Sequence, residues 1–178
     1  MLKWISHLLV RQAEKRIGVD FDYTHKIADT SFGLLMRYTK IFNFMDPNKH
    51  TPKLAYHAAR LRGAISADCG TCVETEIKLA QIAKIDNADI DLILTEKYDQ
   101  LSDGVAAAAK LADAVTGPRQ DDPEARRVIL EVYDEAGLIE LSYAMTGAAV
   151  VPGIKRAMGY AQSCNIDTMR KLTGGIAS

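Results

Sequence analysis

Apolar residues recur every three to four positions along most of the chain, the spacing of amphipathic helices. In residues 2–16 this stripe holds Trp4, Ile5, Leu8 and Leu9. The pattern predicts a first helix that ends at Gly18. A second helix is predicted over residues 25–44, ending before the turn signal Asp46-Pro47-Asn48.

Helix start signals divide the rest of the chain. Thr51-Pro52 predicts a helix to about residue 65, with Thr51 as cap and Pro52 at the first helical position. Capping residues at 66–68 then introduce a helix from Cys69 to about residue 84. Asn87 can cap a short helix that carries Ile90, Leu92 and Ile93. Further helices are predicted over 103–115 and from residue 123 to a stop at Gly137, with two more separated at 152–153.

Evidence for strands is thin, because the few β-branched clusters are short and isolated. The fold class expected is therefore all-α. We expect one domain overall, in which residues 1–50 form an N-terminal helical extension and residues 51–178 form the core. The extension is too apolar for a free tail, so it should cover the core or reach a neighbouring subunit.

Length, composition and charge fit an ordinary globular domain. The chain has 178 residues, of which 48% are hydrophobic, enough for a buried core. With 22 basic and 23 acidic residues, net charge is -1, which argues against a nucleic-acid partner. The longest apolar run, residues 138–151, contains Glu140 and stops at Pro152, short of the roughly 20 residues of a spanning helix, so no membrane partner is expected. No signal peptide is apparent, and three cysteines favour the reducing cytoplasm.

The most informative motif is Cys69-Gly70-Thr71-Cys72. A thioredoxin-like site would need a preceding strand, whereas residues 53–65 have helical composition and period. A structural zinc site needs about four ligands, and Cys164 is the only cysteine left. We therefore favour a redox pair at the start of a helix, with no metal and no cofactor.

Helix geometry places an acid beside this pair. At about 100° per residue, Cys72 and Glu76 lie near 300° and 340° when Cys69 is at zero. The three side chains share one face with Val73 and Ala80, so Glu76 falls within an apolar arc. A buried carboxylate there needs a partner or a role.

Thiol chemistry could use such an arrangement, because the thiolate is the reactive form of cysteine. The helix N-terminus stabilises negative charge in its first turn, and Glu76, four residues after Cys72, could act as a base. His57 lies on the preceding helix, and antiparallel packing of the two helices would bring it near Cys72 and Glu76. Cys69 is placed to close a disulfide with Cys72.

Each of these residues also has a purely structural interpretation. The cysteines could be inert, Glu76 could merely hold Arg60 or Arg62, and His57 could be a satisfied core histidine. Tyr56 could donate a hydrogen bond into the site or simply pack. Cys164 is expected to be a small buried hydrophobe, and no constellation is evident around the remaining histidines, His7, His25 and His50.

The segment 51–165 resembles the alkylhydroperoxidase D and carboxymuconolactone decarboxylase family, most sharply over residues 53–84. In the redox members of this family, a Glu stands eleven residues before the Cys-X-X-Cys motif, and a His follows the motif after three residues. The same spacing here joins His57, the cysteine pair and Glu76, so the acid and the imidazole have changed places. A hydrogen bond between them would survive the exchange. Thr71 stands where many members have a histidine. The resemblance implies an alkylhydroperoxidase D-like helical bundle, Cys72 as peroxidatic and Cys69 as resolving cysteine, and a homo-oligomer such as a dimer, trimer or hexamer.

Three functions follow from these observations. The leading hypothesis is a thiol-dependent peroxidase or disulfide oxidoreductase that reduces a small-molecule hydroperoxide through a Cys69–Cys72 cycle. Glu76 and His57 would relay protons, and a thiol or dithiol would act as reductant. The alternatives are a cofactor-free lyase or decarboxylase that uses His57 and Glu76, and a non-enzymatic oligomeric sensor of oxidation.

Overall fold

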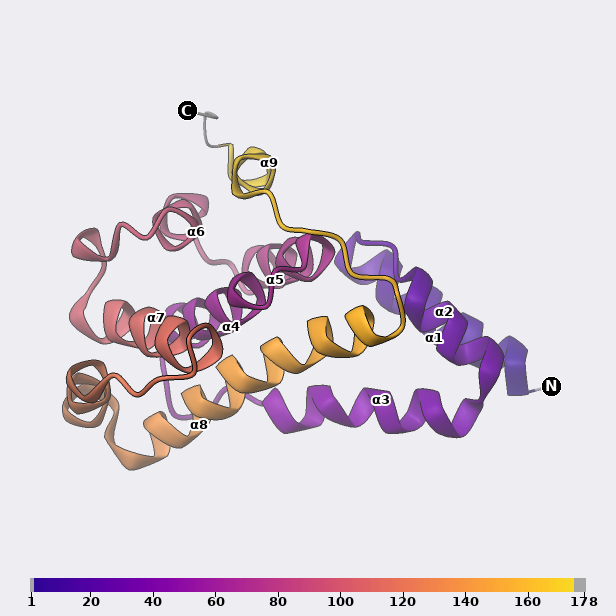
Figure 1. Ribbon diagram of the computed structural model, residues 1–178, viewed down its shortest axis with the longest axis horizontal. Helices are drawn as coiled ribbons and strands as arrows, with labels where there is room; N and C mark the ends of the chain where they lie inside the picture. The colour runs from indigo at the N-terminus through magenta and orange to yellow at the C-terminus, as the bar shows by residue number, and fades with distance from the viewer. Residues whose placement is uncertain (1, 175–178) are drawn as a thin grey trace.

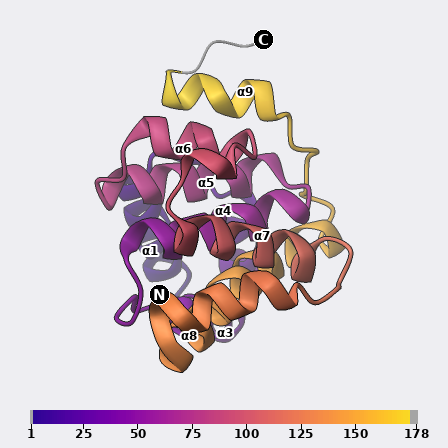
Figure 2. The ribbon, with the colours of Figure 1, turned by 90° about the vertical axis from the view of Figure 1, so that its left-hand side faces the viewer.

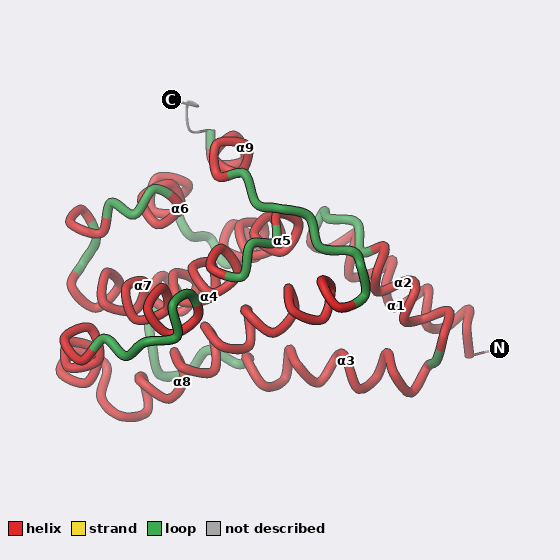
Figure 3. Tube along the Cα trace, in the orientation of Figure 1, coloured by secondary structure: helices red, strands yellow, loops and turns green. Residues whose placement is uncertain are grey.

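The computed structural model describes residues 2–174 and is built from helices and loops. No strand occurs in this part of the chain, which confirms the all-α prediction (Figure 3). Residue 1 and residues 175–178, the outer ends of the two predicted segments, lie outside the described residues. The helices, in chain order, are α1 (Leu2–Ile17), α2 (Asp22–Thr30), α3 (Phe32–Met45), α4 (Lys53–Ser66), α5 (Gly70–Ile82), α6 (Asn87–Leu94), α7 (Asp103–Thr116), α8 (Pro123–Ala157) and α9 (Ile166–Arg170), with short 3-10 turns at Tyr98–Gln100 and Lys171–Thr173.

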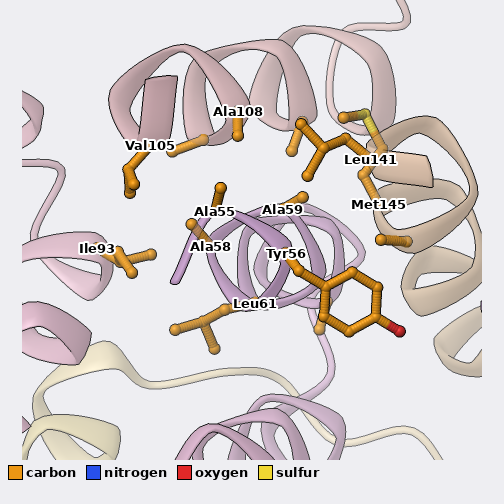
Figure 4. Close-up of a cluster of buried hydrophobic side chains, with 14 of the residues drawn as sticks. Ala55, Tyr56, Ala58, Ala59, Leu61, Ile93, Val105, Ala108, Leu141 and Met145 are labelled. Atoms are coloured by element: carbon orange, nitrogen blue, oxygen red, sulfur yellow. The ribbon is translucent and has the colours of Figure 1, made fainter. Parts of the chain in front are cut away.

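Helix α4 is the centre of the core. Its side chains radiate towards α6, α7 and α8, where they meet Ile93, Val105 and Leu141 (Figure 4). Small residues let the neighbouring helices approach closely. At Gly63 an added Cβ would lie 2.3 Å from the carbonyl oxygen of Met145 on α8, so this crossing requires glycine.

The N-terminal extension is three helices rather than the predicted two. Ser31 breaks the segment predicted over residues 25–44, because its backbone is extended and its hydroxyl accepts the N–H of Leu34 at the start of α3. Helices α1–α3 share a small apolar cluster around Val10, Ala28 and Leu35. In Figure 1, α3 runs beside α8, and α1 and α2 lie beyond the end of α5.

A histidine pair joins α1 to α2, although the sequence suggested no constellation there. The Nδ1 atoms of His7 and His25 lie 2.8 Å apart, and their rings stack with centroids 5.0 Å apart. Their outer nitrogens face the carboxylates of Asp29 at 2.8 Å and Glu14 at 3.1 Å. These contacts hold α2 against α1.

Helix α8 is continuous where two stops were predicted. Gly137 and Pro152 both lie inside it, so neither ends it. The interruption comes earlier, at Asp134, whose φ is 59° and whose side chain accepts the N–H groups of Ala136 and Gly137. Asp134 thus caps the long second part of the helix from within.

The sequence predicted no helix long and apolar enough to cross a membrane; one long apolar helix does not decide this, so the absence of a membrane partner stays a prediction. Among the described residues, α8 alone meets that criterion, by length and composition only. Its most apolar window is 44% buried inside the fold, with α4 and α7 packed on it. Helix α9, near the C-terminus, packs against α5 and α6 (Figure 2).

Glu140 of α8 organises the loop between α3 and α4. Its carboxylate accepts the backbone N–H groups of Lys49, His50 and Thr51, and also the hydroxyl of Thr51 and the amide of Asn48. Thr51 is therefore not the cap of α4, and the helix begins at Lys53 with Pro52 as its cap. Although burial works against the charge, these donors lower the pKa of Glu140.

We predict that Glu140→Gln destabilises the protein by about 2 kcal/mol, because an amide cannot accept from all of these donors. Urea unfolding at pH 7 measures the change. Glu135→Gln is the matched control, since Glu135 is exposed on the same helix. Equal stability of the two variants would show that Glu140 does not organise the loop.

Candidate functional site

The cysteine pair lies at the N-terminus of α5. Cys69 is the N-cap residue and Cys72 lies in the first turn, with its N–H bonded to the Cys69 carbonyl at 3.0 Å. The two residues are disulfide-bonded, with Cα atoms 5.3 Å apart, which confirms the predicted pairing. Cys69 is fully buried, whereas Cys72 is 8% exposed. The two sulfurs thus differ in access.

The backbone around the pair is held by the segment that follows α8. The N–H of Gly70 donates to the carbonyl of Gln162 at 2.9 Å, and Asp68 accepts the N–H of Cys164 at 2.7 Å. Asp68 itself has a φ of 49°, and this left-handed turn directs the chain from α4 into α5. Cys164 is half-buried against the core, and burial, followed by the Asp68 charge, raises the pKa of its thiol.

Glu76 is buried, as predicted, and its partner is Arg60 of α4. The guanidinium donates from Nε to one carboxylate oxygen at 2.8 Å and from Nη2 to the other at 3.1 Å. Burial opposes the charge, but the carboxylate of Glu76 outweighs it and raises the pKa of Arg60. In this forked ion pair each oxygen of the carboxylate accepts one N–H of Arg60. Arg62, the other candidate, pairs with Asp113 and Glu96 instead.

Further polar contacts extend from Arg60 to the end of α3. Its Nη1 donates to Asp46 at 3.1 Å and to the hydroxyl of Tyr56 at 3.0 Å. That hydroxyl also lies within hydrogen-bond distance of the Asp46 carboxylate and of the Met45 carbonyl. Burial, partly offset by Arg60, raises the pKa of Tyr56, so the phenol stays neutral. Tyr56 therefore serves this network rather than the cysteines.

His57 approaches the same region without a hydrogen bond to Glu76. Its Nδ1 is buried and has no hydrogen-bond partner among the described residues, while the oxygens of Glu76 accept from Arg60. The acid–imidazole hydrogen bond suggested by the sequence is thus replaced by the Arg60–Glu76 pair. Burial, followed by the charge of Arg60, lowers the pKa of His57 to about 4, so the ring is neutral at pH 7.

Cys72, Glu76 and His57 line one cavity of about 950 Å³. Helices α4, α5 and α8 form one wall, and α1–α3 form the other with largely apolar side chains, including Leu9, Val10, Leu35, Met36 and Phe42. The structure therefore brings three of the four predicted residues to a common space, and Cys69 lies directly behind Cys72. Their catalytic roles stay predictions.

Lys155 and Thr71 belong to this site, and the sequence did not single out either as functional. The Lys155 ammonium donates to the hydroxyl of Thr71, between the two cysteines, and lies 4.8 Å from the ring centre of Tyr23. Lys155 follows Thr71 by 84 residues in the chain, so no local spacing could have linked them.

No group of three or more histidine, cysteine or acidic side chains is positioned to hold a metal ion in residues 2–174. No protein family matches the chain, and no curated protein or solved structure matches it either. The findings therefore define an all-helical protein with a Cys-X-X-Cys disulfide. The likeness to the alkylhydroperoxidase D family stays a prediction from the motif.

We predict that His57 makes the fold acid-sensitive. Below pH 6.5 the unfolded chain protonates this histidine, whereas the folded protein does so only near pH 4. The unfolded state then binds more protons, and the contribution of His57 to stability is lost as pH falls through that window. At pH 4.5 this loss is about 2 kcal/mol relative to pH 7.

Urea unfolding of His57→Gln at both pH values tests this prediction. The variant should lose about 2 kcal/mol less than wild type between pH 7 and pH 4.5. His50→Gln is the control, because the His50 side chain is exposed, and it should behave as wild type. If both variants keep the full acid loss, the buried imidazole is not its source.

Proposed function

We propose that this protein is a thiol-dependent peroxidase or disulfide oxidoreductase that cycles between a Cys69–Cys72 dithiol and a disulfide. One observation carries the proposal. The two cysteines are joined at the start of a helix, and only Cys72 of the pair lines a large cavity. A disulfide that merely staples the fold has no need of such access. The likeness of the motif to alkylhydroperoxidase D proteins is in accord with this function.

In the proposed cycle, the thiolate of Cys72 attacks the terminal peroxide oxygen. An S–O bond forms, the O–O bond breaks, and the alkoxide takes up a proton and leaves as an alcohol. The Cys69 thiolate then attacks the Cys72 sulfur and expels hydroxide, which leaves as water. A thiol or dithiol reductant returns the two electrons by exchange with the disulfide.

Two features of the site favour thiolate formation at Cys72. Cys72 lies in the first turn of α5, where the positive end of the helix dipole favours negative charge. His57 is neutral at pH 7, and its buried Nδ1 has no hydrogen-bond partner within residues 2–174; it lies along the same cavity and can exchange a proton during turnover. Glu76 would complete the relay as a carboxylate oriented by Arg60.

The cavity wall supports an organic rather than a purely inorganic peroxide as substrate. Most of its lining is apolar, and its volume of about 950 Å³ exceeds what hydrogen peroxide needs. An alkyl group would displace water from this surface and place its peroxide end against Cys72. The cytoplasm remains the expected compartment and a homo-oligomer the expected assembly.

We predict that the purified protein consumes cumene hydroperoxide with dithiothreitol over many turnovers, and that Cys72→Ser lowers this rate to the uncatalysed background. Cys69→Ser should still react once, because the attacking thiol remains, but it cannot close the disulfide. Loss of peroxide and mass spectrometry of the trapped sulfenic acid measure the two steps. Cys164→Ser is the control and should keep wild-type turnover.

Two results would contradict the proposal. Equal turnover in wild type and Cys72→Ser would remove Cys72 from the chemistry. A single stoichiometric oxidation of wild type, with no turnover under any thiol or dithiol reductant, would point instead to a protein that senses oxidation.

A further inference from the structure

Lys155 is a buried cation with no carboxylate partner. Its residue is 5% exposed, and none of the ion pairs formed among residues 2–174 includes it. The face of Tyr23 lies beneath the ammonium at 4.8 Å. Burial lowers the pKa of Lys155, and the more distant charge of Asp22 only partly offsets this. A buried ammonium in this state is costly unless another negative charge appears nearby.

The hydrogen bonds of Lys155 lead directly to the cysteine pair. The ammonium can only donate, so the Thr71 oxygen accepts from it. The remaining proton of that hydroxyl is then free to point at Cys69, whose Sγ lies 3.9 Å from Thr71 Oγ1. A path of polar contacts therefore runs from the ammonium through the hydroxyl to the sulfur of Cys69.

Other charges near the pair are already neutralised or lie in solvent. Arg60 is held by Glu76, and Asp68 has a side chain that is 59% exposed and faces Arg156 at 3.8 Å. His57 is neutral at pH 7. Lys155 is thus the buried positive charge available to a thiolate at Cys69.

We propose that Lys155 is a positioning residue that stabilises the Cys69 thiolate through the hydroxyl of Thr71. In the disulfide form, sulfur carries no charge and the ammonium lacks a counter-ion. Reduction creates that counter-ion, so the Lys155 charge favours the reduced pair. The inference rests on the proposed thiol–disulfide cycle and adds to it the group that sets the redox balance.

This arrangement assigns different roles to the two sulfurs. A reductant thiolate reaches Cys72, because that sulfur lines the cavity, and forms a mixed disulfide with it. The Cys69–Cys72 bond breaks, and its electron pair leaves on Cys69 as the thiolate that Thr71 and Lys155 stabilise. A more stable leaving thiolate makes this exchange faster. In the oxidative half, the same thiolate is the group that attacks Cys72 and closes the disulfide.

The experiment measures the disulfide itself rather than peroxide turnover. Wild type, Lys155→Met and Thr71→Val are equilibrated in dithiothreitol buffers of defined redox ratio, and the oxidised fraction is read by thiol alkylation and mass spectrometry. Thiolate absorbance of the reduced proteins at 240 nm gives the pH of half-ionisation. Circular dichroism checks that each variant is folded.

Both variants should shift the equilibrium with dithiothreitol about tenfold towards the disulfide, and both should need a higher pH for half-ionisation. The double variant should shift no further than the larger single effect, because the two residues act along one path. Lys155→Arg and Thr71→Ser keep the charge and the hydroxyl, and should restore wild-type values. Lys110→Met removes an exposed charge on α7 and is the control.

Unchanged equilibrium and ionisation in folded Lys155→Met, or an equal shift in Lys110→Met, would overturn the inference. Should Lys155→Met fail to fold, Thr71→Val decides, and its wild-type behaviour would likewise overturn it. The outcome is separate from the proposed peroxidase activity. If wild type never turns over peroxide but the shift is found, the redox role of Lys155 stands and the peroxidase proposal falls.

Discussion

The ion pair between Arg60 and Glu76 connects the helices that surround the cavity. It joins the central helix α4 to the cysteine helix α5, and through Asp46 it reaches the end of α3. Because both groups are buried, removal of either would leave an uncompensated charge, which makes the geometry hard to change. The pair therefore fixes how the N-terminal extension, the core and the cysteine helix α5 meet around one cavity.

The cavity beside this ion pair has an apolar side and a polar side. Helices α1–α3 supply an apolar wall opposite Cys72, while α4, α5 and α8 supply the charged and titratable groups. The cysteines occupy a helix start, where backbone N–H groups favour negative charge. His57 stays neutral because it is buried beside Arg60, whereas Lys155 is buried without a carboxylate partner in the described part of the chain. The same cavity is thus lined by one neutral imidazole and by one cation that forms no ion pair among residues 2–174.

Local patterns in the sequence were sufficient to predict which residues meet in much of the site. The spacing of Cys69, Cys72 and Glu76 placed them on one helical face, and their burial follows from the apolar residues between them. The preceding helix brought His57 to the same cavity, since the connection to α5 is only a few residues long. The sequence did not predict which residues form ion pairs with each other. Arg60 and Arg62 are both buried on α4, and only the packing of α5 and α7 decided that Arg60 meets Glu76 while Arg62 meets Asp113.

The amino-acid sequence by itself determined the all-α class, the pairing of the Cys-X-X-Cys motif and most helix starts, because capping, periodicity and short-range spacing are local properties. It misplaced some helix ends. The local cap at Ser31 breaks one predicted helix, and Gly137 and Pro152, which were predicted as breaks, lie inside α8. Only the tertiary structure decided that Lys155 reaches Thr71 and that Glu140 binds the loop before α4. Those contacts join residues more than 80 positions apart, and such proximity arises from the packing of whole helices rather than from any local pattern.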